Sequence, residues 1–160
     1  MTESFTVGIG TSVVEGDLTV PGDAAGVVVF AHGSGSSRHS PRNQAVARAL
    51  QDHRFATLLL DMLSQEEDRA EAAGGRPDLA GAALEGVRCP VLLIVGGHDD
   101  TVRRLNKAAA ARLPGTRELV VVPGAGHLFE EPGALEQVAD AAAGWFDRHL
   151  VPGGGQAFTL

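Results

Sequence analysis

Four short apolar runs limit what this chain can fold into. They lie within residues 26–31, 55–60, 90–95 and 117–122. Each lacks the polar alternation of a half-exposed strand, which is typical of parallel strands buried on both faces. Residues 5–9 and 13–20 precede them and predict an antiparallel hairpin. Because segments with helical spacing separate the later runs, we expect an α/β fold: a three-layer α/β/α sandwich with a mostly parallel sheet.

Capping residues predict where the intervening helices begin. Ser40 is followed by proline, so it is expected to cap a helix over 41–52. Thr101 is expected to cap a second helix that runs to Leu113. The last helix is predicted to open at residues 131–133, and its apolar residues then recur at helical spacing.

Length, charge and cysteine content narrow the class of protein. At 160 residues the chain predicts a single domain over 1–150 with a flexible tail at 151–160. A net charge of −7 argues against a nucleic-acid partner. The sequence has no 18-residue apolar run, so no membrane span is predicted, and the first residues do not resemble a signal peptide. One cysteine, Cys89, is expected to be a small buried residue and fits a cytoplasmic location.

Polar residues gather directly after three of the apolar runs. These segments are His32-Gly33-Ser34-Gly35-Ser36, Gly96-Gly97-His98-Asp99-Asp100 and Pro123-Gly124-Ala125-Gly126-His127. The carboxyl ends of parallel strands meet at one edge of a sheet, where α/β proteins place their sites. An acid followed by a histidine at such ends supplies two members of a hydrolytic triad. The carboxylate would fix the imidazole tautomer, and the imidazole would accept a proton from a nucleophile or a water.

The motifs at 28–35, 93–102 and 122–129 resemble those of the α/β-hydrolase superfamily, near its dienelactone-hydrolase-like group. The resemblance covers residues 13–62 and 74–149. It implies that Asp99 is the triad acid and His127 the triad histidine. It also implies an oxyanion loop at 32–36, and a hydrolase that needs no cofactor for its small-molecule substrate, an ester, thioester or lactone.

Near these strand ends, His32, Gly33, Gly35 and Arg38 are candidates for substrate binding. Asp99 is preferred over its neighbour Asp100 because it fits the family's Gly-x-x-Asp-x-x-Val pattern. His98 has no second ligand at metal spacing, so no metal site is predicted.

The sequence departs from the family at the nucleophile. No Gly-x-Ser-x-Gly elbow is present, and only 28 residues separate Asp61 from Pro90. The elements that the family places in this interval need on the order of 80–100 residues. We therefore expect an internal deletion near residues 68–74, which leaves a truncated α/β-hydrolase fold. Strands 27–31 and 91–95 would then either pair directly or leave open edges. Open edges favour a homodimer, formed through those edges or by swapping.

Two alternatives follow for the nucleophile and for the function. Ser34 or Ser36 is a candidate substitute nucleophile, or else the loop only binds an anion through its backbone. The chain is accordingly either a hydrolase of the carboxylic-ester class or a non-catalytic pseudo-hydrolase. The second would be a remnant that binds a ligand or another copy of itself.

Overall fold

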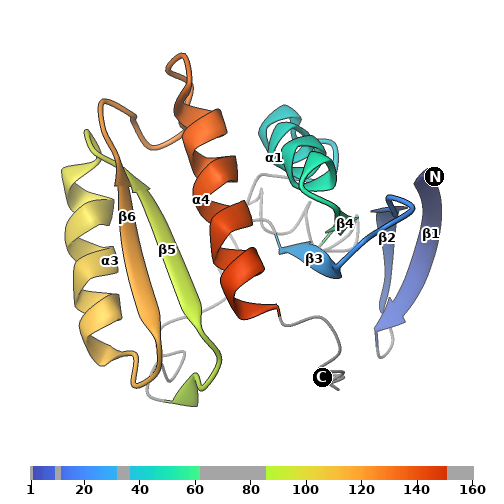
Figure 1. Cartoon of the computed structure of the whole chain (residues 1–160), viewed down its shortest axis with the longest axis horizontal. Helices are drawn as coiled ribbons and strands as arrows, with labels where there is room; N and C mark the ends of the chain where they lie inside the picture. Colours follow the sequence, from blue (N-terminus) through green and yellow to red (C-terminus); the bar gives the residue numbers. More distant parts are fainter. Residues whose placement is uncertain (1, 10–11, 32–36, 62–85, 151–160) are drawn as a thin grey trace. The chain divides into compact units, whose positions relative to one another are not determined.

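The computed structural model of the chain describes residues 2–9, 12–31, 37–61 and 86–150 (Figure 1). These residues fall into two compact units. The first unit holds β1 (Thr2–Ile9), β2 (Ser12–Thr19), β3 (Gly26–Ala31), α1 (Pro41–Asp52) and β4 (Phe55–Leu60). The second unit holds β5 (Val91–Gly96), α3 (Asp100–Arg112), β6 (Arg117–Val122) and α4 (Ala134–His149). The single domain over 1–150 stays a prediction, and the predicted tail and deletion point lie outside the described residues.

The sheet of the first unit has the strand order β1-β2-β4-β3. β1 and β2 pair antiparallel, with Val7 opposite Val14, which confirms the predicted hairpin. β2 also pairs antiparallel with β4, whereas β3 runs parallel to β4, with Val28 opposite Thr57. The α/β architecture of parallel strands followed by helices is therefore present, with an antiparallel hairpin added beside β4.

The core of the first unit lies between α1 and one face of β4. Leu50 of α1 and Phe55 of β4 are each only 1% exposed. Thr57 is fully buried, and its hydroxyl oxygen accepts a hydrogen bond of 2.7 Å from Gln51 Nε2 on α1. That bond satisfies a polar group that would otherwise be costly to bury. The start of α1 also agrees with the sequence, because Ser40 caps it and Pro41 is its first residue.

Burial on both faces is the expectation for every apolar run. It is wrong for β6, where Val121 is 38% exposed, and for β3. Val28 is buried, but Val27 and Val29 are each 56% exposed. β3 is an edge strand of its sheet, so β4 is its only hydrogen-bonded neighbour there. Because Val28 pairs with Thr57, which bonds to α1, its neighbours Val27 and Val29 point to the opposite face.

The second unit is built around the parallel pair of β5 and β6, with Gly96 opposite Val122. α3 and α4 flank this pair on its two sides (Figure 1). Val122, Ala125 and Ala134 form a buried cluster, and Trp145 of α4 is 5% exposed. In the described part of the chain β5 pairs with β6 and β3 with β4, in two separate sheets, so the direct pairing of 27–31 with 91–95 is not found.

Two local predictions about the second unit are wrong. Asp99, not Thr101, is the N-cap of α3, and its side chain accepts from the backbone N–H of Val102. Cys89 is exposed, because it lies in the segment before β5 and not within the strand. No helix in the described ranges is both long and apolar enough to span a membrane.

Candidate functional site

The ends of β5 and β6 are joined by backbone hydrogen bonds that bring their loops together. The Gly97 N–H donates to the carbonyl of Val122 at 2.8 Å, and the His98 N–H donates to the carbonyl of Ala125 at 2.9 Å. The strand ladder therefore continues past the last paired residues into the two turns. As a result, residues 97–99 and 123–127 lie side by side.

Glycine is required where these turns come closest. A Cβ on Gly96 would lie 2.2 Å from the carbonyl oxygen of Gly126 and 2.5 Å from that of Ala125. Both distances are far below van der Waals contact. Gly124 adopts φ of +74°, a left-handed conformation that favours glycine. The glycines of both segments thus allow the two loops to meet without a gap.

The two carboxylate oxygens of Asp99 have different partners, one at the start of α3 and the other at His127. Oδ1 accepts the Val102 N–H at 3.0 Å at the start of α3, and Oδ2 lies 2.6 Å from His127 Nδ1. The hydrogen bond from Val102 lowers the pKa of Asp99 below its ordinary value. The bond and charge of His127 act in the same direction, and desolvation opposes both. Asp99 is therefore ionised at neutral pH, and its side chain is 14% exposed.

His127 presents the other side of its ring to solvent. Its side chain is 68% exposed, and Nδ1 faces Asp99. An ionised carboxylate can only accept hydrogen bonds, so Nδ1 carries the hydrogen and Nε2 has a free lone pair when the ring is neutral. This is the tautomer and orientation that a general base needs. The pair can orient an imidazole and accept a proton from a group placed at Nε2.

The structure brings together the predicted acid and the predicted histidine. The residues of the predicted oxyanion loop lie outside the described residues; they are His32, Gly33, Ser34, Gly35 and Ser36. His98 is exposed, and its backbone joins the two turns. Within the described ranges, no group of three or more His, Cys, Asp or Glu is placed to hold a metal ion.

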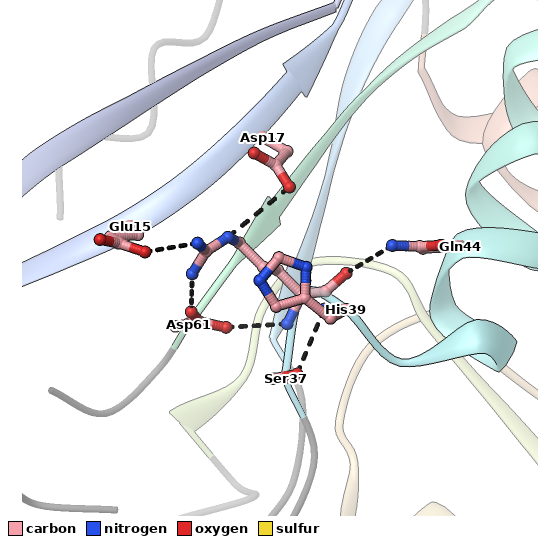
Figure 2. A network of polar contacts seen from close by, with 7 residues as sticks. Glu15, Asp17, Ser37, His39, Gln44 and Asp61 are labelled. Atoms are coloured by element: carbon pink, nitrogen blue, oxygen red, sulfur yellow. Dashed lines mark hydrogen bonds and ion pairs between the residues drawn. The ribbon is translucent and has the colours of Figure 1, made fainter. Parts of the chain in front are cut away.

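Arg38 lies in the first unit and forms ion pairs with three carboxylates, which are labelled in Figure 2. Its guanidinium pairs with Asp61, at the end of β4, and with Glu15 and Asp17, both on β2. Its backbone N–H also donates to Asp61 Oδ1 at 2.8 Å. One carboxylate thus holds both the main chain and the side chain of Arg38.

These contacts favour the protonated, charged form of the Arg38 guanidinium. Burial acts to lower the pKa of the guanidinium, but the hydrogen bond to Glu15 and the charges of Asp61 and Glu15 outweigh it, so the pKa is raised. The described contacts of Arg38 therefore tie the segment before α1 to β2 and β4. Its predicted role in substrate binding stays a prediction.

Sequence reasoning missed two residues that shape these loops. The sequence identifies Asp61 only as the end of a strand, yet it holds Arg38. It identifies Glu131 only as the opening of a helix, yet its Oε1 accepts the Gly126 N–H at 2.9 Å. For Glu131 the available signal is a carboxylate close to a glycine-rich turn, and for Asp61 it is a carboxylate directly after a strand; both are too common to single out a residue.

Comparison with known proteins places this arrangement in a class. An α/β unit with an acid and a histidine after successive parallel strands is that of the α/β-hydrolases. The crystal structure of dienelactone hydrolase from Anabaena variabilis matches with a TM-score of 0.86 and 35% sequence identity, over 94% of this chain and 99% of that one. The chain belongs to the dienelactone hydrolase family of α/β-hydrolases.

More distant structures share the fold alone. Est1E from Butyrivibrio proteoclasticus matches with a TM-score of 0.68 at 13% identity, over 92% of this chain and 98% of that chain. The esterase domain of a Rhodothermus marinus protein matches with a TM-score of 0.68 at 17% identity, over 94% of this chain and all of that chain. No protein-family model matches the chain.

Two curated relatives come from Mycobacterium tuberculosis, strains CDC 1551 and H37Rv, and are provisionally named phosphoribosyl transferases. Each is 42% identical over 206 aligned positions, which cover 92% of this chain and 46% of the relative. The chain therefore spans about half the length of these relatives. Because the alignment is longer than the 160 residues of the chain, the relatives contain residues within the matched span that this chain lacks.

Proposed function

We propose that this protein is a hydrolase of the carboxylic-ester class that acts on a small ester, thioester or lactone. His127 serves as the general base and Asp99 holds its ring. The backbone of the 32–36 loop, with the Ser34 N–H as one donor, stabilises the oxyanion that forms when the carbonyl is attacked. His32, Gly33, Gly35 and Arg38 are the proposed substrate-binding residues.

The observation that carries this proposal is the contact of 2.6 Å between Asp99 Oδ2 and His127 Nδ1. It occurs in a chain of the dienelactone hydrolase family, after two adjacent parallel strands. The transferase name belongs to relatives of which more than half lies outside the match. The matched part corresponds over almost its whole length to a hydrolase, which favours hydrolase chemistry for this chain.

The proposed nucleophile is Ser34 or Ser36, or a water activated by His127. A serine hydroxyl would lose its proton to His127 Nε2 as its oxygen attacks the carbonyl carbon. The proton would then pass to the leaving alcohol or thiol, and water would release the acyl group by the same route. With water as the nucleophile, one such step suffices and no covalent intermediate forms.

A fluorophosphonate probe and a panel of p-nitrophenyl esters test the proposal. We expect turnover that falls at least about 100-fold in His127→Ala, because general base catalysis contributes roughly 10²–10⁴-fold. His53→Ala, which removes an exposed imidazole at the end of α1, serves as the matched control. Labelling mapped to Ser34 or Ser36 identifies a serine nucleophile, whereas turnover without labelling identifies water.

A non-catalytic pseudo-hydrolase is the second candidate function. The sequence has no Gly-x-Ser-x-Gly elbow, and the relatives contain residues within the matched span that this chain lacks. If those residues include the nucleophile, the acid and the histidine are what remains of a triad. Turnover equal in the wild type and in His127→Ala, together with an absence of labelling, would support this function.

We also propose that the chain forms a homodimer through an open strand edge. β3 is an edge strand of the described sheet, and Val27 and Val29 on it are each 56% exposed. Exposed edges with apolar side chains favour pairing with another strand. Sedimentation velocity should give the mass of two chains, and Val29→Lys should shift it to one. A wild-type mass of one chain contradicts the dimer.

A further inference from the structure

The loop that carries His127 is closed by a side chain from beyond it. Glu131 lies four residues after His127, and its Oε1 accepts the backbone N–H of Gly126 at 2.9 Å. Gly126 is the residue directly before His127. The carboxylate therefore fixes the peptide from which the imidazole projects.

The close approach of Glu131 depends on the absence of a side chain at Gly126. A Cβ on Gly126 would lie 3.1 Å from Glu131 Oε1, tighter than ordinary van der Waals contact. The main chain of Glu131 is also held, because its carbonyl accepts the N–H of Ala134 at 3.0 Å. Ala134 is the first residue of α4 and is 2% exposed. The carboxylate is thus attached to a packed helix start on one side and reaches the His127 loop on the other.

Other backbone hydrogen bonds also restrain the same loop. The carbonyl of Ala125 accepts the His98 N–H at 2.9 Å, and the carbonyl of Gly126 accepts the Phe129 N–H at 3.4 Å. The first fixes the chain before Gly126, and the second is a long bond within the turn. The imidazole itself is 68% exposed, so packing contributes little to its placement. The hydrogen bond from Gly126 to Glu131 is the short contact nearest to His127 in the main chain.

We propose that Glu131 is a positioning residue, which holds the loop so that His127 Nδ1 stays on Asp99. A hydrogen bond to a carboxylate is stronger than one to a neutral acceptor, so it restrains this peptide effectively. Without it, the peptide between residues 126 and 127 can rotate. The ring then samples positions in which Nδ1 leaves Asp99 and both neutral tautomers are populated. The consequence for turnover rests on the proposed function, whereas the consequence for the imidazole does not.

Three variants separate this role from a general effect on folding. Glu131→Ala removes the acceptor, Glu131→Gln keeps an oxygen at the same distance along the side chain, and Glu130→Ala removes the neighbouring exposed carboxylate as a matched control. The readout is the pair of imidazole ¹⁵N resonances of His127 at about pH 8, where an ordinary imidazole is neutral. The spectrum of His127→Ala assigns them. Circular dichroism checks that each variant is folded.

In the wild type, Glu131→Gln and Glu130→Ala, the resonances should report hydrogen on Nδ1. In Glu131→Ala they should move toward the average of the two tautomers, and ester turnover should fall roughly 10–100-fold through kcat with little change in KM. Unchanged ¹⁵N resonances in a folded Glu131→Ala overturn the proposal. If Glu131→Ala does not fold, Glu131→Asp, whose shorter side chain withdraws the acceptor, is judged by the same resonances. A wild type without turnover counts against the proposed function, and the resonances still decide the role of Glu131.

Discussion

At the scale of single residues, Asp99 is the most informative side chain in the described structure. One oxygen caps α3 and the other meets His127, so one residue begins a helix and orients a base. The sequence identifies the residue from its place after a strand and from the family pattern. It does not identify the cap, because Asp99 and Thr101 are both good capping residues and only the geometry of the turn distinguishes them.

Replacing Asp99 by asparagine should separate its two roles. In Asp99→Asn the new side chain would still offer an oxygen to the Val102 N–H, but its amide hydrogens would face His127 Nδ1 and favour the wrong tautomer. We expect ester turnover to fall about 10²–10⁴-fold while the far-ultraviolet circular dichroism is unchanged. Asp100→Asn, at the adjacent exposed carboxylate that pairs with Arg103, is the control and should retain turnover. Equal losses in the two variants would contradict the assignment of Asp99.

The lowered pKa of Asp99 predicts how stability depends on pH. The folded pKa lies below the unfolded value of about 3.9, so the folded state favours the ionised form. The stabilisation is complete above that value and is lost as the pH falls through the folded pKa. Urea unfolding should show a stability difference between the wild type and Asp99→Asn that is constant near neutrality and shrinks below about pH 4. A stability difference that grows on acidification would contradict a lowered pKa of Asp99 in the folded state.

At the scale of elements, the sequence predicts where the strands lie better than it predicts how they pair. The bounds of β3, β4 and β6 agree with the apolar runs because those runs are local patterns. The division into two sheets could not be predicted from them, since strand pairing is a long-range property and the segment between β4 and β5 departs from the family. The exposure of Val27 and Val29 could not be predicted either. The apolar run of an edge strand such as β3 has the same sequence pattern as that of a central strand.

Alanine at Gly96 should disrupt the junction between β5 and β6. Its Cβ would overlap the carbonyl oxygens of Ala125 and Gly126, so the two loops would have to separate. We expect a loss of about 1–3 kcal/mol in the free energy of unfolding, typical of overpacking. Chemical denaturation measures it, with Gly22→Ala as the control, where an added Cβ has no atom within 4 Å. An unaffected Gly96→Ala would mean that the close approach is not maintained in solution.

Removing the guanidinium of Arg38 should destabilise the first unit. Arg38→Met would remove the cation that pairs with Asp61, Glu15 and Asp17, at a cost of about 1–3 kcal/mol at neutral pH. Urea unfolding monitored by amide NMR signals of β2 and β4 would follow this loss. Arg48→Met, at an exposed position on α1, should have little effect, and a similar loss there would contradict the contribution of these ion pairs.

At the scale of the whole molecule, the chain is shorter than its family membership would predict. The chain belongs to the dienelactone hydrolase family, yet it has fewer residues than the span over which its curated relatives align with it. Motifs at strand ends are enough to predict the family and the acid–histidine pair, because each motif is short and local. They do not identify a nucleophile for His127, because the sequence has no Gly-x-Ser-x-Gly elbow.

Restoring the missing residues should restore full catalysis if their loss removed the nucleophile. The segment of the Anabaena variabilis enzyme that follows the strand equivalent to β4 and precedes that equivalent to β5 can be inserted between Asp61 and Pro90. We expect ester turnover to rise at least about 100-fold and to depend on His127. The same insert with its nucleophile changed to alanine is the control. A folded chimera without any gain would place the defect elsewhere.

Because Asp99 both caps α3 and contacts His127, positions 99 and 127 would change differently in evolution if catalysis were lost. Selection for folding alone would retain a capping residue at position 99, because a side chain without an acceptor oxygen removes the cap of α3. His127 has no comparable structural duty, since its side chain is 68% exposed and projects from a loop. In a decaying gene the two positions would therefore diverge at different speeds, the histidine first. Among shortened members of the family, a histidine retained at this position reports selection for chemistry, whereas a capping residue retained at position 99 reports selection for the helix.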